Sequence, residues 1–408
     1  MRKKIYIVCL AIILVMLYVY NRDIMFYNDD FTDTNKVSTL LPVVSMFFFS
    51  FLGFVISFSL LPVSGILRRF TRFMICLYVI SFFYSLKYPL NSKEEYITII
   101  LPLLLFYIMS LSLCYIKNAQ KIIWGISCLA ILLSIYYARG YSENLLGSIN
   151  ATTASYHILF FLPFLLCHKN KVLRIIFAVM IFVITMVSLK RGGLLASAAA
   201  ILVYLYVSEF SLKGRRLSFA GVLVAVIAIL GIIKLYLVLD ENLLGGIVTA
   251  RMDSIDETGG SGRLDVYSGY LKFIGDDNLF NYIFGHGWWG SIRDSRVGVT
   301  CHNDFLECFV DFGVFGFVLY VSFVVSLIKL CLNMIRTRHE YAPAMAASLA
   351  IFFVNSMVSH ILIYPKFLMT LTLFWGFIVS VISNVKYPNI NYKIRKNENR
   401  TLNIPCSM

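Results

Sequence analysis

The chain has 408 residues, of which 59% are hydrophobic and 14% are charged, and its mean hydropathy is +0.78. Soluble globular domains are about half apolar and about a quarter charged, so this chain is too apolar to bury its surface in one core. The composition excludes a soluble enzyme, a disulfide scaffold and a disordered chain. We therefore predict an all-α polytopic integral membrane protein.

The apolar residues fall into twelve runs, each close to the roughly 17–25 residues that a helix needs to cross a bilayer. The first run follows Met-Arg-Lys-Lys and no small-x-small cleavage site follows it, so we expect an uncleaved span and not a signal peptide. The predicted spans are 5–20, 40–61, 73–90, 97–116, 122–138, 152–167, 172–189, 194–210, 217–239, 305–328, 342–363 and 366–385.

The net charge of +14 divides unequally between the two sides of the predicted membrane. With a cytoplasmic N-terminus, the inner joints and the tail contain 22 of the 36 basic residues and three of the 22 acids, which gives +19 inside and −5 outside. Every inner joint is basic, as the positive-inside bias requires, so both termini are expected in the cytoplasm. The charge therefore orients the protein and does not indicate a nucleic-acid partner.

One outer joint, between spans nine and ten, is much longer than the others. It contains three glycine clusters, the pair Trp288-Trp289, and a segment over 263–274 that is predicted to be a short amphipathic helix. Long loops with such internal pattern are functional or disordered, and the aromatic residues argue against disorder. The predicted organisation is spans one to nine in 1–239, the loop in 240–304, spans ten to twelve in 305–385 and a basic cytoplasmic tail in 386–408.

Three acids lie at the outer end of span ten. Asp304, Glu307 and Asp311 have the spacing i, i+3, i+7, which places them on one face of a helix. Ionisable residues are costly inside a bilayer, so this face is expected to meet a water-filled cavity and not lipid. The alternative is a helix that merely begins at the level of the lipid headgroups.

Basic residues on the outer side oppose the topology bias and are therefore candidates for function. Lys190 and Arg191 stand before a two-glycine turn, and Arg263 begins the predicted loop helix. Arginine binds phosphate oxygens through two parallel hydrogen bonds, so these residues predict a site for a lipid-linked phosphate just outside the membrane. The other outer arginines are Arg139, Arg293 and Arg296. For the last two, simple solvation among the headgroups is the alternative.

His286 and His302 are the histidines expected on the outer face, whereas His360 is expected to make a polar contact inside a span. No familiar zinc-ligand spacing is present, so neither a metal nor another cofactor is predicted. Cys301 and Cys308 lie seven residues apart at a helix start and are expected to be free thiols.

Five segments follow one another in a fixed order along the outer side: Ser188-Leu189-Lys190-Arg191-Gly192-Gly193, Ser261-Gly262-Arg263, Phe284-Gly285-His286-Gly287, His302-Asn303-Asp304-Phe305-Leu306-Glu307 and Asp311-Phe312-Gly313-Val314-Phe315-Gly316. This ordered set resembles the bacterial O-antigen polymerase and O-antigen ligase superfamily. One departure is Leu189-Lys190, which separates Ser188 from Arg191 where the family usually has Ser-Arg adjacent.

The resemblance implies a GT-C-like glycosyltransferase of the bacterial inner membrane that works on the periplasmic side without metal or cofactor. Its donor would be a glycan on undecaprenyl diphosphate, and a chain-length regulator and a flippase would be its partners. A polymerase of oligosaccharide repeat units is the first expectation, and a ligase that transfers the glycan to lipid A-core is the second. A transporter or flippase is a further alternative, which predicts two repeated halves that the single long loop does not favour.

The resemblance also implies roles for particular residues. Arg191 and Arg263 would bind the diphosphate and stabilise the charge of the leaving group. His302 would act as general base on the acceptor hydroxyl, and Asp304 or Glu307 would orient His302 or the acceptor. The further substrate-binding residues expected are Lys190, Arg139, Trp288 and Trp289, of which the two tryptophans would stack on sugar rings.

Overall fold

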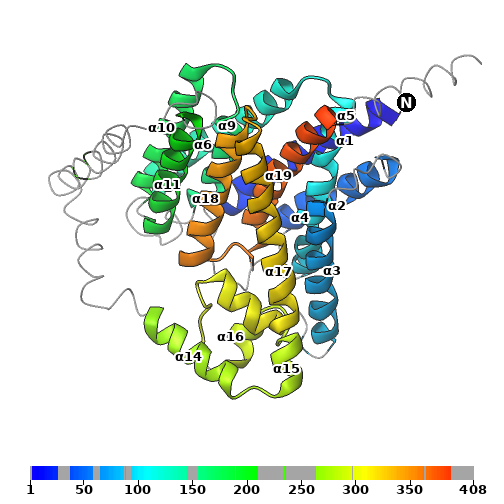
Figure 1. The fold of residues 1–408 in the computed structure, drawn as a ribbon, viewed down its shortest axis with the longest axis vertical. Coiled ribbons are helices and arrows are strands. Elements are labelled where there is room, and N and C mark those ends of the chain that lie inside the picture. The colour runs from blue at the N-terminus through cyan, green and yellow to red at the C-terminus, as the bar shows by residue number, and fades with distance from the viewer. Residues whose placement is uncertain are drawn as a thin grey trace, which may run out of the picture.

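The computed structural model describes residues 2–25, 37–57, 65–86, 88, 93–144, 154–188, 190–209, 231, 234, 263–295, 297–362 and 364–386. All regular structure in these ranges is helical, which confirms the all-α class (Figure 1). The helices are α1 (Arg2–Met25), α2 (Val37–Ser57), α3 (Gly65–Ser85), α4 (Lys93–Ser110), α5 (Ser112–Tyr115), α6 (Ala119–Asn144), α8 (Tyr156–Leu159), α9 (Leu162–Leu165), α10 (Lys171–Val187), α11 (Arg191–Val207), α14 (Arg263–Gly275), α15 (Leu279–Phe284), α16 (Gly290–Asp294), α17 (Asp304–Arg336), α18 (Ala342–Val358) and α19 (Pro365–Lys386).

The long helices are consistent with a polytopic membrane protein. Among the described residues, six helices are long and apolar enough to cross a membrane, and three shorter helices are also apolar. The six are Arg2–Met25, Leu40–Ser57, Ile97–Tyr115, Ala119–Gly140, Asp304–Arg336 and Pro365–Ser383. Ten of the predicted spans overlap described helices of comparable length, the span at 152–167 contains only short helices, and in the span at 217–239 only residues 231 and 234 are described. The total of twelve spans therefore stays a prediction.

Two of the predicted spans differ from the helices observed there, and each difference has a physical reason. Helix α3 begins at Gly65, eight residues before the predicted span, because arginine side chains can extend to the headgroups while their aliphatic stems pack in the apolar region. The predicted span 152–167 is instead the two four-residue helices α8 and α9, and residues 154–168 are all buried. Irregular backbone at membrane depth is tolerated where protein surrounds it.

Helices α4 and α19 form the centre of the bundle. In the most apolar part of each, 78% and 83% of residues are buried, against 33–44% in the other long helices. They pack closely at Gly376, where a Cβ atom would lie 2.5 Å from the carbonyl oxygen of Phe106. Small residues allow such close approach between membrane helices. Around this pair, α11 packs on α18, α3 on α17 and α1 on α2.

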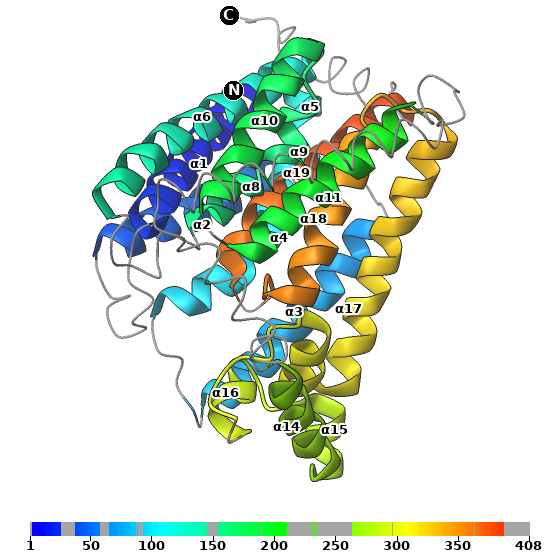
Figure 2. The same cartoon turned by 90° about the vertical axis from the view of Figure 1, so that its left-hand side faces the viewer.

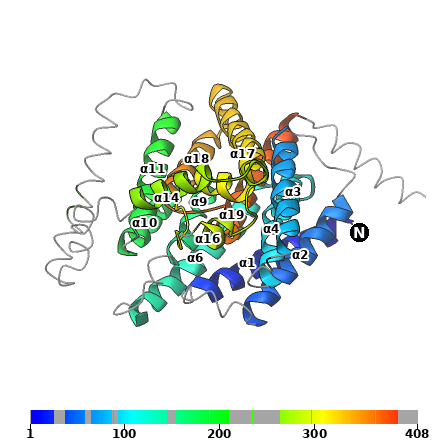
Figure 3. The same cartoon turned by 90° about the horizontal axis from the view of Figure 1, so that it is seen from below.

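Helices α14, α15 and α16 lie together at one end of the bundle, which we call the α14–α16 end. Figure 2 shows them below α3 and α17, while the N-terminus lies toward the opposite end. The view from below in Figure 3 shows α14 and α16 lying across this end, in front of α17, α18 and α19.

The α14–α16 end is attached to the bundle at a break in helix α17. At Gly313 the backbone leaves the helical region with φ of 64°, and the carbonyls one turn earlier become free. The carbonyl oxygens of Val310 and Asp311 accept hydrogen bonds from the backbone N–H groups of His286 (3.1 Å) and Gly287 (2.7 Å). A Cβ atom on Gly313 would lie 2.3 Å from a backbone carbonyl of α15, so only glycine fits at this contact.

Candidate functional site

Asp304, the first residue of α17, is buried and joins α17 to the turn between α18 and α19. Its Oδ1 accepts hydrogen bonds from the backbone N–H groups of Ile361 (2.9 Å) and Leu362 (3.0 Å), and its Oδ2 accepts one from the Ser356 hydroxyl (2.7 Å). The side chain is 0% exposed. Asp304 therefore positions the 359–362 turn, and its predicted contact with substrate finds no support in its burial.

The other two acids on the same face of α17 also accept hydrogen bonds from protein groups. Glu307 accepts hydrogen bonds from the Ser291 hydroxyl (2.6 Å) and the Cys301 N–H (3.1 Å), and Asp311 accepts one from the Ser291 N–H (2.7 Å). The prediction of a water-filled cavity beside this face is wrong, because all three acids are buried and satisfy donors of the α14–α16 end and of the α18–α19 turn. Cys301 and Cys308 are buried free thiols, as expected.

Two histidines from distant parts of the chain stack on each other at the α14–α16 end. The rings of His302 and His360 are 5.0 Å apart at 22°, and the His360 ring continues the stack onto Tyr364 at 4.4 Å. His302 lies just before α17 in the left-handed region, with φ of 49°. His360 lies in the turn after α18, where its Nδ1 is 3.3 Å from the Thr300 hydroxyl. The prediction that His360 makes a contact inside a span is therefore wrong.

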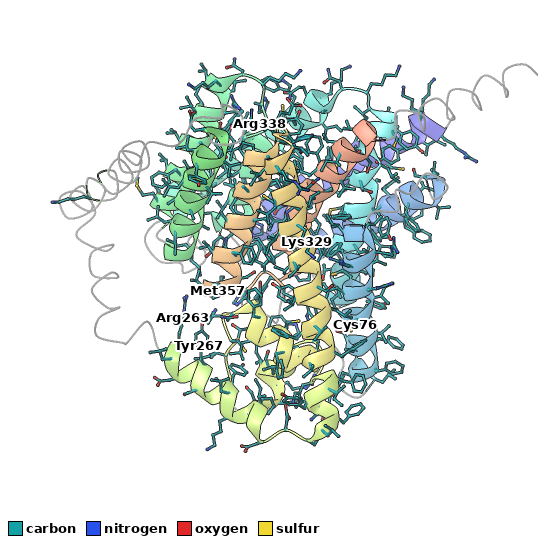
Figure 4. All side chains as sticks on the ribbon, in the orientation of Figure 1. Cys76, Arg263, Tyr267, Lys329, Arg338 and Met357 are labelled. Atoms are coloured by element: carbon teal, nitrogen blue, oxygen red, sulfur yellow. The ribbon has the colours of Figure 1, made fainter. Side chains whose placement is uncertain are left out.

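Three cationic side chains lie close enough to this histidine pair to lower the pKa of His360. Arg263 begins α14, Lys190 stands immediately before α11, and Lys366 lies in the first turn of α19. Figure 4 shows Arg263 at the start of α14, below the end of α18 that Met357 marks. We call Lys190, Arg263, His302, His360 and Lys366 the cationic cluster.

The cations change the protonation of the histidines. Burial, and after it the positive charges of Arg263 and Lys190, together lower the pKa of His302 to about 4. The pKa of His360 lies well below its ordinary value because of burial, then the neighbouring His302, then Lys190, Lys366 and Arg263. Both imidazoles are therefore neutral at neutral pH, and each has a nitrogen that can accept a proton.

The two glycines after Arg191 have a packing role. A Cβ atom on Gly192 would lie 2.6 Å from the Tyr156 hydroxyl, and one on Gly193 would lie 3.3 Å from the same ring. The ring of Tyr156 in turn lies under Lys190, whose Nζ is 5.9 Å from its centroid. The glycines thus let the start of α11 approach α8. Arg191 is the first residue of α11, next to the cluster in sequence, and its side chain lies outside the described part.

The two predicted stacking tryptophans are placed differently from each other. Trp288 is 3% exposed and packs on Phe312 at 5.9 Å, so its burial does not support contact with a sugar. Trp289 is half-buried, and its ring meets Tyr364 edge-on at 5.5 Å, beside the histidine stack. Arg139 is exposed near the end of α6, and none of the contacts described for the cluster includes it.

His286 and Arg293 belong to a polar network inside the α14–α16 end. The His286 ring nitrogens lie 2.9 Å from Asp277 and 3.3 Å from Asp294. Arg293 pairs with Asp294 at 2.9 Å and lies over the Tyr88 ring at 4.2 Å, so it is a packed residue and not a solvated charge. Arg296 lies outside the described residues.

Sequence reasoning missed the contribution of the α18–α19 turn. This turn contributes His360, Tyr364 and Lys366 to the site. The predicted spans 342–363 and 366–385 assign nearly all of this segment to the membrane. A signal was present, because Pro365 favours a helix start and Lys366 adds a cation on the predicted outer side, against the topology bias.

Residues 175–321, a little over a third of the chain, match the sequence model of the O-antigen ligase family. The matched region runs from α10 to the middle of α17 and includes Lys190, Arg263 and His302, but not His360 and Lys366. A comparison with curated proteins gives no match. The matched region is thus similar to the O-antigen ligase family, and the long apolar helices of the described residues are consistent with a membrane protein.

Proposed function

We propose that the cationic cluster is the active site of a glycosyltransferase that transfers a glycan from a polyprenyl diphosphate to a hydroxyl group of another sugar. The observation that carries the proposal is a neutral, partly buried His302 imidazole among cationic side chains, with a pKa of about 4. The site thus combines a base that can accept the proton of the acceptor with cations that can bind the diphosphate and the additional negative charge that develops on it as it leaves.

In the proposed reaction, an acceptor hydroxyl oxygen forms a bond to the anomeric carbon of the donor glycan. The bond from this carbon to the diphosphate oxygen breaks, and its electron pair leaves with the diphosphate. His302 takes the proton of the acceptor hydroxyl. Arg263, Lys190 and Arg191 bind the diphosphate, so the protein's own cations supply the charge stabilisation and no metal ion is required. Stacking on His360 keeps the His302 ring in place.

We further propose that this reaction takes place on the periplasmic face of the bacterial inner membrane, with undecaprenyl diphosphate as the donor lipid. Support comes from the charge distribution, because Arg338, in the basic joint after α17, lies at the end of the bundle opposite Arg263 (Figure 4). A flippase would then have to deliver the donor across the membrane, and a chain-length regulator is the expected partner.

Polymerisation of repeat units is the product assignment that we favour, and ligation to lipid A-core is the second candidate because the matched family is described as O-antigen ligase. Deletion of the gene separates the two. A polymerase mutant still carries lipopolysaccharide capped with one repeat unit, whereas a ligase mutant carries none. Lipopolysaccharide without any repeat unit would overturn the polymerase assignment.

The catalytic assignment is tested with purified protein, one lipid-linked repeat unit and a chelator of divalent metals. We expect His302→Asn and Arg263→Gln each to lower the rate at least a hundredfold, the range typical for a general base or a charge-stabilising group. Matched controls are His339→Asn, at the opposite end of the bundle, and Lys272→Gln, exposed on the same helix as Arg263. Normal rates in both site variants would refute the assignment, and loss of wild-type activity with the chelator would refute metal independence.

A further inference from the structure

A groove lies at the end of the bundle opposite the cationic cluster, between α1, α5 and the first turns of α6. Its volume is about 530 Å³, within the range of ordinary small-molecule sites. Figure 1 shows α5 and the N-terminus at the end of the molecule away from α14 to α16. None of the residues that form the proposed active site lines this groove.

The groove has a cationic mouth and an apolar interior. Lys3, Lys117 and Lys121 are exposed side chains at its rim, and none of the described residues that line the groove is acidic. Below the rim, the walls include Ile7 and Leu14. In the described part of the chain, no carboxylate pairs with any of these three lysines, so their charges remain available to a ligand.

Along α1, the residues that line the groove extend over a length comparable to the thickness of one leaflet of a bilayer. From Lys3 to Leu14 the helix rises roughly 16 Å, about half of the roughly 30 Å hydrocarbon core. On α6, Gly125 leaves the wall open, because a Cβ atom built there would meet nothing within 4 Å. An acyl chain would therefore fit along the apolar wall while its headgroup lies among the lysines.

We propose that this groove binds an anionic phospholipid of the leaflet opposite the active site, with its phosphate at Lys3, Lys117 and Lys121 and one acyl chain along α1 and α6. Charge complementarity selects the anionic headgroup, because three amines with no acidic partner attract a net negative charge and gain little from a zwitterion. The apolar wall selects a lipid over a free phosphate. This site is independent of the proposed glycosyl transfer.

Binding is measured by native mass spectrometry of the full chain in detergent, with phosphatidylglycerol as the probe and phosphatidylcholine of the same chains as the comparison. We expect phosphatidylglycerol to bind at least tenfold more tightly. Replacing Lys3, Lys117 and Lys121 together by Gln should weaken its binding about a hundredfold, at about fivefold per lysine. The matched triple variant Lys169→Gln, Lys171→Gln and Arg338→Gln removes the same charge from exposed sites outside the groove and should leave binding unchanged.

A second variant tests the apolar wall without changing charge. Gly125→Leu should fill the groove and weaken phosphatidylglycerol binding, whereas Gly65→Leu, also at a position with open space, should not. Glycerol 3-phosphate at millimolar concentration should not displace the lipid. Equal binding of both lipids, equal losses in the two triple variants, an unaffected Gly125→Leu variant, or displacement by glycerol 3-phosphate would each overturn the proposal.

Discussion

The structural role of Asp304 can be tested by removing its carboxylate. Asp304→Ala leaves the backbone N–H groups of Ile361 and Leu362 without their acceptor, and both residues are buried, at 1% and 4% exposure. An unsatisfied buried donor costs about 1–3 kcal/mol, so the two amides together destabilise the folded state by about 2–6 kcal/mol. Asp304→Asn keeps one acceptor oxygen, and we expect it to cost less than half as much.

The assay follows unfolding of the detergent-solubilised protein on heating, with a fluorescent dye that reacts with buried thiols as they become exposed. Asp304→Ala should lower the midpoint by several degrees and reduce glycan transfer, because the 359–362 turn carries His360. Asp265→Ala, which removes an exposed acid from α14, is the matched control and should change neither. An unchanged midpoint in Asp304→Ala, or an equal loss in Asp304→Asn, would refute the role of Asp304 as the acceptor of the turn.

Three further predictions follow from the site. Arg263→Gln removes a positive charge that lowers the pKa of His302. The acidic limb of the pH–rate profile should therefore move from about pH 4 toward the ordinary histidine value of about 6.5. A limb that stays at pH 4 would contradict the electrostatic argument. Gly313→Ala places a side chain at a positive φ, which costs about 1–2 kcal/mol, and also brings that side chain against the backbone of α15. The thermal midpoint of unfolding should therefore fall. A variant with wild-type stability would show that the close contact does not exist. Gly192→Ala places a methyl group 2.6 Å from the Tyr156 hydroxyl and should reduce transfer with normal expression, which glycan chain length on gels would measure.

The helical membrane architecture could be predicted from the sequence because apolar runs and joint charges are local properties. Arg263 and His302 could be singled out for the same reason, since an arginine or a histidine on the predicted outer side is visible without knowing the fold. The helix face formed by Asp304, Glu307 and Asp311 was located correctly, but the prediction that it meets a water-filled cavity was wrong. Its periodicity shows that three acids share a face, but not whether water or buried N–H groups satisfy them.

The contribution of His360 could not be predicted, because it depends on a long-range contact. Nothing near His360 in sequence indicates that its ring stacks on His302, 58 residues earlier. The turn that carries His360 is positioned by Asp304, which accepts hydrogen bonds from backbone N–H groups. Every residue except proline has such a group, so the sequence of the turn does not reveal which residues bind the carboxylate. The helix Arg2–Met25 shows the opposite case, because the composition of this segment alone was sufficient to predict an apolar helix long enough to cross a membrane.

The three partners of Asp304 have a consequence for the synthesis of the protein. Ser356, Ile361 and Leu362 all follow Asp304 in the chain, so Asp304 is synthesised before any of these donors exists. Until α18 and α19 have been inserted, the carboxylate must remain hydrated and His302 lacks its stacking partner. The cluster can therefore assemble only after the last two helices have been inserted, and a chain whose translation stops after α17 contains the matched family region but no assembled cluster.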